Sequence, residues 1–78
     1  MLLIEWIKKN NMNVTQFAKK MGVNASGIYK YIHGAKRLSP DMAVRIEDFT
    51  NGEVTRFEAL WPELYDKNWI YQKDYYGR

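Results

Sequence analysis

Apolar residues recur along this chain in short groups, spaced three or four apart and separated by polar residues. This spacing places the apolar side chains of a group on one face of a helix, which can then be buried. The groups predict five short helices joined by brief loops. Their approximate ranges are residues 2–9, 15–21, 25–33, 40–51 and 55–61. The pattern therefore predicts an all-α fold, a compact domain of five helices.

Capping residues mark where three of these helices begin. Ser39 precedes Pro40, so a capping hydroxyl stands before the residue favoured at the first helical position. Thr55 and Glu58 have the spacing of a capping box, in which each side chain accepts from the other's backbone N–H. Asn24 is a suitable N-cap for the third helix. These signals agree with the starts that the apolar pattern predicts.

Residues 14–31 have the pattern of a helix-turn-helix, in which two helices cross steeply after a short turn. Ala18 supplies the small residue needed where the helices approach most closely. Gly22 supplies a residue that adopts positive φ without strain in the turn, and Gly34 is the expected stop of the second helix. The residues expected to hold the motif together are Phe17, Ala18, Met21, Gly22, Val23, Ile28 and Tyr31. Because the second helix of this motif enters the major groove, the pattern predicts DNA recognition by residues 25–33.

The helix over residues 25–33 divides into two faces. At about 100° per residue, Ile28, Tyr31 and Ile32 fall on one side and are expected in the core. The residues expected to read bases from the other side are Ala25, Ser26, Tyr29 and Lys30. The hydroxyls of this set can donate or accept hydrogen bonds, its lysine can reach guanine acceptors, and its alanine can contact a thymine methyl group.

Flanking positions are expected to contact the DNA backbone. Gln16 lies in the first turn of the preceding helix, whose N-terminus points at phosphates in this motif. The full set assigned to the backbone is Gln16, Asn24, His33, Lys36 and Arg37. For His33 alone, a solvated side chain is the favoured expectation. Phosphate contacts of this kind make affinity fall steeply with rising salt.

The distribution of charge favours a polyanionic partner. The net charge of the 78 residues is +3. Residues 1–40 carry seven lysines and arginines against one acid, whereas residues 41–78 carry five against eight. A basic half on a small domain is typical of nucleic-acid binding, although a solvated lysine-rich surface has the same composition.

Composition argues against an enzyme. The chain has no cysteine and one histidine, so it offers no disulfide and no cysteine-based zinc site. The carboxylates are scattered; Glu47 and Asp48, for example, are adjacent on a helix and point about 100° apart. In the absence of a nucleophile–base pair or a metal cluster, we expect no catalytic residue, no metal, no cofactor and no small-molecule substrate.

The motif and the segment after it resemble the Cro-like and YdaS-like helix-turn-helix regulators of phages and prophages, within the lambda-repressor-like group. The resemblance covers about residues 12–64. It rests on TQFAKKMGVNASGIYKYIHGAKR, on the more distinctive LSPDMAVRIEDFTNGEVTR after it, and on Leu60-Trp61-Pro62. The resemblance implies a lambda-repressor-like fold and a transcriptional regulator, usually a repressor that acts as a dimer on a double-stranded DNA operator near its own gene.

The expected location follows from the same sequence. Glu5 interrupts the apolar run at residues 2–4 and no basic leader precedes it, so no signal peptide is predicted. No apolar run approaches the roughly 18 residues of a transmembrane helix. We therefore expect a cytoplasmic, nucleoid-associated protein of a bacterial or phage-infected cell, with no membrane partner.

The chain is expected to divide into a domain and a tail. Residues 1–65 are assigned to the helix-turn-helix DNA-binding domain, and residues 66–78 to a C-terminal tail rich in aromatic residues. An extended strand, an aromatic arm packed on the body and a partly ordered terminus are the open alternatives for this tail. The homodimer is expected to form through the helix over residues 55–61 or through the arm over residues 69–76.

A protein-binding role is the alternative function. Some relatives in the group resemble antitoxin partners of toxin genes, so this hypothesis assigns DNA to the third helix and a toxin or other protein partner to the C-terminal half. Aromatic residues are favoured at protein interfaces, and Phe57 and Trp61 are candidates for such a surface. The favoured expectation for these two side chains is that they complete the core.

Overall fold

In a computed structural model of the chain, residues 1–66 and 69 are described, and they form helices without any strand. The helices are α1 (Leu3–Lys9), α2 (Val14–Met21), α3 (Ala25–Ile32), α4 (Pro40–Phe49) and α5 (Arg56–Leu60), followed by the 3-10 turn η1 (Pro62–Leu64). Each predicted helix is present, with ends within two residues of the expected ones; α4 ends at Phe49, earlier than predicted. The predicted all-α fold is confirmed.

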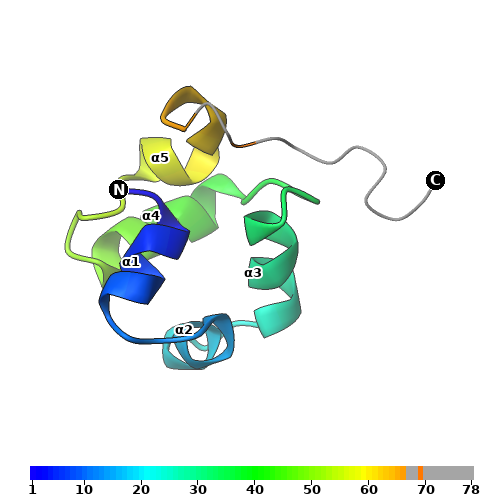
Figure 1. The fold of residues 1–78 in the computed structure, drawn as a ribbon, viewed down its shortest axis with the longest axis vertical. Helices are drawn as coiled ribbons and strands as arrows, with labels where there is room; N and C mark the ends of the chain where they lie inside the picture. The colour runs from blue at the N-terminus through cyan, green and yellow to red at the C-terminus, as the bar shows by residue number, and fades with distance from the viewer. Residues whose placement is uncertain (67–68, 70–78) are drawn as a thin grey trace.

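The helix-turn-helix and the C-terminal helices lie at opposite ends of the domain (Figure 1). α2 packs against α3 at the lower end of the view, and α5 packs against α4 at the upper end. α1 lies between these two ends. The arrangement leaves the outer side of α3 at one edge of the molecule.

The core joins the helices through large side chains. Phe17 of α2, Tyr31 of α3 and Ile46 of α4 are at most 1% exposed. The ring of Phe17 meets Trp6 and Phe49 edge to face, with centroids 6.0 and 5.6 Å apart. Such edge contacts between aromatic rings contribute beyond the apolar area that they bury. They fix the first helix of the motif against α1 and α4.

The predicted N-caps are confirmed. The side chains of Asn24, Ser39 and Thr55 accept hydrogen bonds from backbone N–H groups two or three residues later, at 2.8, 3.2 and 3.1 Å. Each bond satisfies one of the N–H groups that a helix start leaves without a partner inside the helix. Local sequence therefore sets the starts of α3, α4 and α5.

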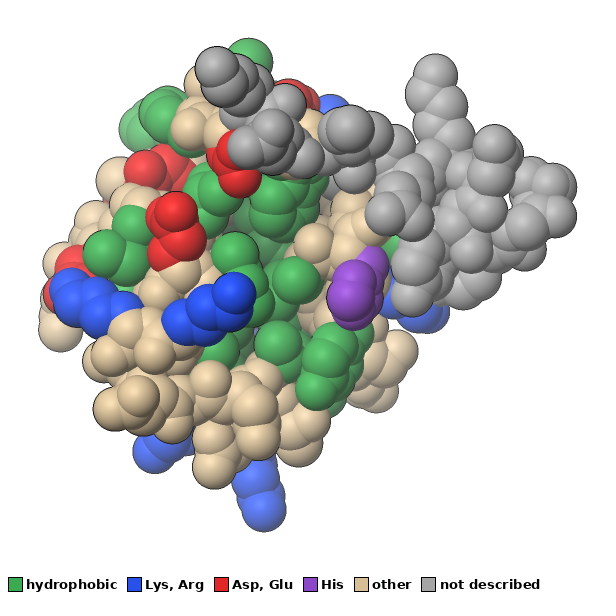
Figure 2. All heavy atoms as spheres, in the orientation of Figure 1, with side chains coloured by type: hydrophobic (Ala, Val, Ile, Leu, Met, Phe, Trp, Pro, Cys, Tyr) green, Lys and Arg blue, Asp and Glu red, His purple; other side chains and the backbone are tan. Residues whose placement is uncertain are grey.

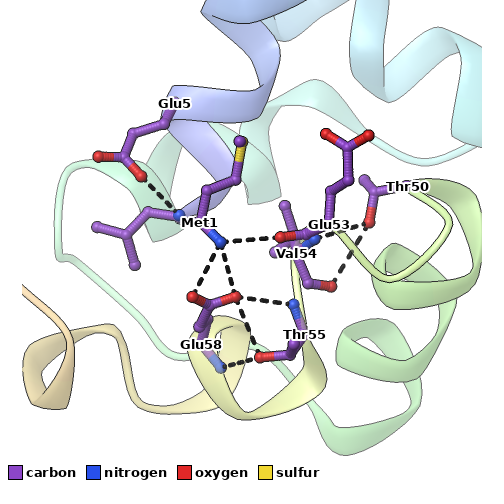
Figure 3. A network of polar contacts seen from close by, with 8 residues as sticks. Met1, Glu5, Thr50, Glu53, Val54, Thr55 and Glu58 are labelled. Carbon is purple, nitrogen blue, oxygen red and sulfur yellow. Dashed lines mark hydrogen bonds and ion pairs between the residues drawn. The ribbon is translucent and has the colours of Figure 1, made fainter.

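A polar network joins the first residue to α5 (Figure 3). The Met1 ammonium donates to the backbone carbonyl of Glu53 at 2.8 Å and to both carboxylate oxygens of Glu58 at 2.9 Å. Glu58 also accepts from the backbone N–H and the hydroxyl of Thr55, which completes the predicted capping box. Burial raises the pKa of Glu58, but these hydrogen bonds and the charge of the ammonium outweigh it, so the pKa is lowered. The ionised carboxylate therefore ties the start of the chain to the start of α5.

The expectation that Phe57 and Trp61 complete the core is wrong. Phe57 is 54% exposed and Trp61 is 44% exposed. α5 has five residues and turns Ala59 inward, while Val54 is buried just before it. These smaller side chains already close this end of the core, so the rings of Phe57 on α5 and of Trp61 directly after it are left exposed.

Most of the predicted tail lies outside the described residues, which omit 67–68 and 70–78. Trp69 is described, and its ring lies against Tyr31 with centroids 5.4 Å apart. It is half-buried and packs against the core. At this one residue, the structure agrees with an aromatic side chain that packs on the body.

Candidate nucleic-acid interface

The turn between α2 and α3 has the geometry that the sequence predicts. Gly22 has φ of 71°, in the left-handed region. The N–H of Val23 donates to the carbonyl of Ala18 at 2.9 Å, and the N–H of Gly22 donates to that of Lys19 at 3.1 Å. These two bonds close the end of α2 in the manner of a Schellman motif and send the chain into α3.

The two predicted faces of α3 are confirmed. Ile28 and Tyr31 are at most 2% exposed, and Ile32 is half-buried beside them. On the other side, the side chains predicted to meet DNA are exposed at Ser26, Tyr29 and His33 and partly buried at Ala25 and Lys30. The structure therefore brings the four predicted base-reading residues to one helix.

The Tyr29 side chain makes one contact through its hydroxyl and another through its ring. Its hydroxyl lies 3.4 Å from the hydroxyl of Thr15 at the start of α2, and either group can donate. Its ring stacks on His33 with centroids 6.3 Å apart and an interplanar angle of 10°. The contact with Thr15 was not predicted, because the two residues are far apart in the sequence and carry no local signal. It orients Tyr29 toward α2 before any ligand arrives.

Two of the predicted backbone contacts also serve as helix caps. Gln16 and Asn13 bond reciprocally, since the N–H of Gln16 donates to the Asn13 side chain at 2.7 Å and the N–H of Asn13 donates to the Gln16 side chain at 2.9 Å. This capping box starts α2 at Val14, one residue earlier than predicted. The side-chain oxygen of Asn24 caps α3 by a single bond, which it accepts from the N–H of Ser26 at 2.8 Å. Their contacts with DNA stay predictions.

The loop after α3 sends its two cations in different directions. Gly34 has φ of 78°, and the N–H of Ala35 donates to the carbonyl of Lys30 at 2.7 Å, so the chain reverses at the predicted stop. Lys36 then extends back along α3. Its Nζ lies 3.7 Å from the point that a Cβ on Gly27 would occupy.

Arg37 points instead to the C-terminal end of the domain. It donates to the backbone carbonyl of Leu60 at 3.2 Å and forms an ion pair with Glu63 at 2.8 Å. The hydrogen bond and charge of Arg37 lower the pKa of Glu63. Sequence analysis missed both contacts, because their partners lie 23 and 26 residues away. The predicted contact of Arg37 with a phosphate stays untested by this geometry.

A groove of about 460 Å³ lies between α3, the loop and the start of α4. Val23, Ile28, Leu38 and Met42 give it apolar walls, and Lys36 lies at its rim with Arg37. This volume is in the range of small-ligand sites. The groove adjoins the first turns of α3 and therefore lies next to the predicted base-reading residues.

Charge is distributed unevenly over the domain. Residues 6–40 contain neither Asp nor Glu, although they hold both helices of the motif. In Figure 2, acidic side chains gather toward the α5 end of the visible face, and basic side chains project from the α2 end. Such a gradient attracts a polyanion to the motif and repels it from the opposite end.

A group of metal-binding side chains and a membrane-spanning helix are not found among residues 1–66 and 69. Their His, Asp and Glu side chains do not gather in groups of three or more that could hold a metal ion. In the same part of the chain, every helix is too short or too polar to cross a membrane.

Comparison with known proteins gives one match. A family model described as helix-turn-helix matches residues 3–57, which is more than half of the chain and includes α1 to α4. No curated protein and no solved structure matches the chain.

Proposed function

Because the chain belongs to the helix-turn-helix family of DNA-binding regulators, we propose that it represses transcription by binding a specific double-stranded operator. The observation that carries this proposal is the exposed side of α3 within a stretch of 35 residues, 6–40, that lacks acidic side chains. A Cro-like role in a phage or prophage, in the cytoplasm of the host cell, agrees with the sequence resemblance.

Sequence reading is assigned to the first turns of α3, which enter the major groove in this motif. Ser26 and Tyr29 offer hydroxyls, Lys30 offers an ammonium, and Ala25 offers a methyl group. Backbone contacts by Gln16, Asn24, His33, Lys36 and Arg37 complete the proposed interface.

A dimer is the proposed active form. Operators of such regulators are usually pseudo-palindromes, with half-sites about 34 Å apart that match a two-fold protein axis. Exposed aromatic side chains are typical of protein interfaces. Phe57 on α5 and Trp61 directly after it are such side chains, and the arm over residues 69–76 is the alternative contact.

Selection from a random duplex library tests the proposal. The purified chain is expected to enrich one pseudo-palindromic sequence, and its affinity is expected to fall steeply between 50 and 200 mM salt, as about six to ten phosphate contacts would require. Enrichment of no sequence would contradict the proposal. Repression is tested separately, by placing the selected operator upstream of a reporter gene.

A protein-binding function is the second candidate, because the exposure of Phe57 and Trp61 also suits a toxin or another protein partner. An antitoxin would combine this surface with operator binding by α3. Salt dependence separates a pure adaptor from a regulator, since an adaptor is expected to bind random duplex DNA with a salt slope near zero. A steep slope favours the regulator.

A further inference from the structure

The backbone conformation at Gly27 does not require a glycine. It lies inside α3, and its φ is not among the positive values of the chain, which for glycine occur at 22, 34 and 52. Glycine inside a helix costs about 0.5–1 kcal/mol relative to alanine. We therefore look for the role of this glycine in a contact outside the backbone of α3.

The space beside Gly27 is taken by Lys36. The Nζ atom lies 3.7 Å from the point where a Cβ would be, which is ordinary contact for one methyl group, whereas a longer side chain would meet the ammonium and require it to move. Both residues border the groove between α3 and the loop. The aliphatic part of Lys36 can lie along the apolar wall of this groove while the ammonium stays at its rim.

The Lys36 ammonium is consequently near the first turn of α3, the end of the helix that is predicted to read bases. Gly27 is the third residue of the helix and follows Ser26, a predicted base-reading residue. The neighbouring cation of the loop, Arg37, is turned away toward Glu63. The sequence predicts that Lys36, which follows the last turn of α3, contacts the DNA backbone. Because the backbone reverses at Gly34, the Lys36 side chain instead returns to the first turn of α3.

We infer that Lys36 is a specificity-determining residue that reads a guanine in the major groove through the gap left by Gly27. Lysine is one of the two side chains that commonly donate to the O6 and N7 acceptors of guanine. The inference rests on the proposed function and changes one assignment within it, because Lys36 moves from the backbone contacts to the base-reading residues and is the one base-reading residue proposed outside α3. It also gives a reason for the glycine, since any longer side chain at residue 27 would displace the ammonium.

The test combines protein and DNA substitutions on the selected operator. Replacing each G·C pair in turn is expected to weaken wild-type binding about 5- to 100-fold at the contacted pair. Lys36→Ala is expected to lose a similar factor on the intact operator and to show no further loss when that one pair is replaced. Gly27→Leu is expected to abolish discrimination at the same pair, whereas Gly27→Ala retains it. Circular dichroism checks that each variant is helical.

The controls separate this contact from general electrostatic attraction. Lys8→Ala removes the same charge from α1, outside the proposed interface, and is expected to leave discrimination at every pair unchanged. If Lys36→Ala weakens binding equally on all duplexes and lowers the salt slope by about one, the residue contacts a phosphate and the inference is wrong. A loss of less than twofold would also overturn it. Equal wild-type affinity for the operator and for random duplex would overturn the proposed function itself.

Discussion

The hydroxyl of Tyr31 donates to the backbone carbonyl of Ala59 at 2.8 Å, inside the domain, and so joins α3 to α5. The next carbonyl of α5, that of Leu60, accepts from Arg37 in the loop after α3. A helix of five residues is not stable by itself and takes its position from its neighbours. Two donors from the recognition segment therefore fix α5, and with it the surface that carries Phe57.

Tyr31→Phe is expected to lower the free energy of unfolding by about 1–3 kcal/mol, because the carbonyl of Ala59 is left without this donor in a buried place. Urea unfolding followed by circular dichroism measures the change. Tyr65→Phe is the matched control, since Tyr65 is 56% exposed and its variant should stay within about 0.5 kcal/mol of wild type. Equal effects of the two substitutions would contradict the assignment.

Alanine at two glycines of the motif is expected to have opposite effects. Gly22→Ala should destabilise the domain by about 1–2 kcal/mol, since its φ of 71° strains any residue with a Cβ although no atom lies within 4 Å. Gly27→Ala should stabilise it by about 0.5–1 kcal/mol, because the helical backbone accepts alanine and the nearest atom is at 3.7 Å. Thermal unfolding of both variants gives the signs. Destabilisation by Gly27→Ala would show that this helix position is tighter than the structure indicates.

The features predicted from sequence are those with a local cause. The Asn24 side chain accepts from a backbone N–H two residues later, and the Glu58 side chain accepts from a backbone N–H three residues earlier. The positive φ of Gly22 follows from the short turn in which it lies. Each of these depends on neighbours within one helical turn, so the order of residues is sufficient to predict them.

The features that sequence missed depend on packing between distant segments. Phe57 is apolar and at helical spacing, but it is exposed because α5 turns Ala59 inward, where the carbonyl of Ala59 accepts from Tyr31, 28 residues away. The direction in which Lys36 and Arg37 point depends on the chain reversal and on partners from other elements. No pattern of spacing contains that information.

Acid is expected to weaken the link between Met1 and Glu58. Because the folded pKa of Glu58 lies below its ordinary value of 4.5, its ionised form adds stability above that pH, and this stability is lost as the pH falls through the folded pKa. Glu58→Gln keeps an acceptor for the capping box but removes the charge. The variant should melt below wild type at pH 7, and the difference should shrink toward pH 3.

Glu53→Gln is the control for this pH series. Its ion pair with Lys9 is about half exposed, and such pairs contribute about 0–1 kcal/mol. Thermal unfolding between pH 7 and pH 3 should therefore give nearly parallel curves for this variant and wild type. Parallel curves for Glu58→Gln as well would mean that its charge does not stabilise the fold.

Lys30→Ala is expected to cost about 1–3 kcal/mol on the selected operator if Lys30 reads a base, with a smaller loss on random duplex. Fluorescence anisotropy with both duplexes measures the two losses. A similar loss on all sequences would indicate a phosphate contact. No loss on either DNA would contradict the proposed orientation of α3.

Phe57→Ser is expected to weaken the proposed dimer while leaving the fold intact, because the ring is 54% exposed and lies on the outer side of α5. Light scattering over a range of concentrations should show a dimer for wild type and a monomer for the variant, with unchanged helical content. A chain that ends after Tyr65 tests the alternative contact, since a dimer that survives this truncation excludes the arm over residues 69–76. A monomeric wild-type chain at every concentration would contradict the dimer. Loss of the dimer only on truncation would assign the contact to the arm and would leave Phe57 and Trp61 as the surface for another protein.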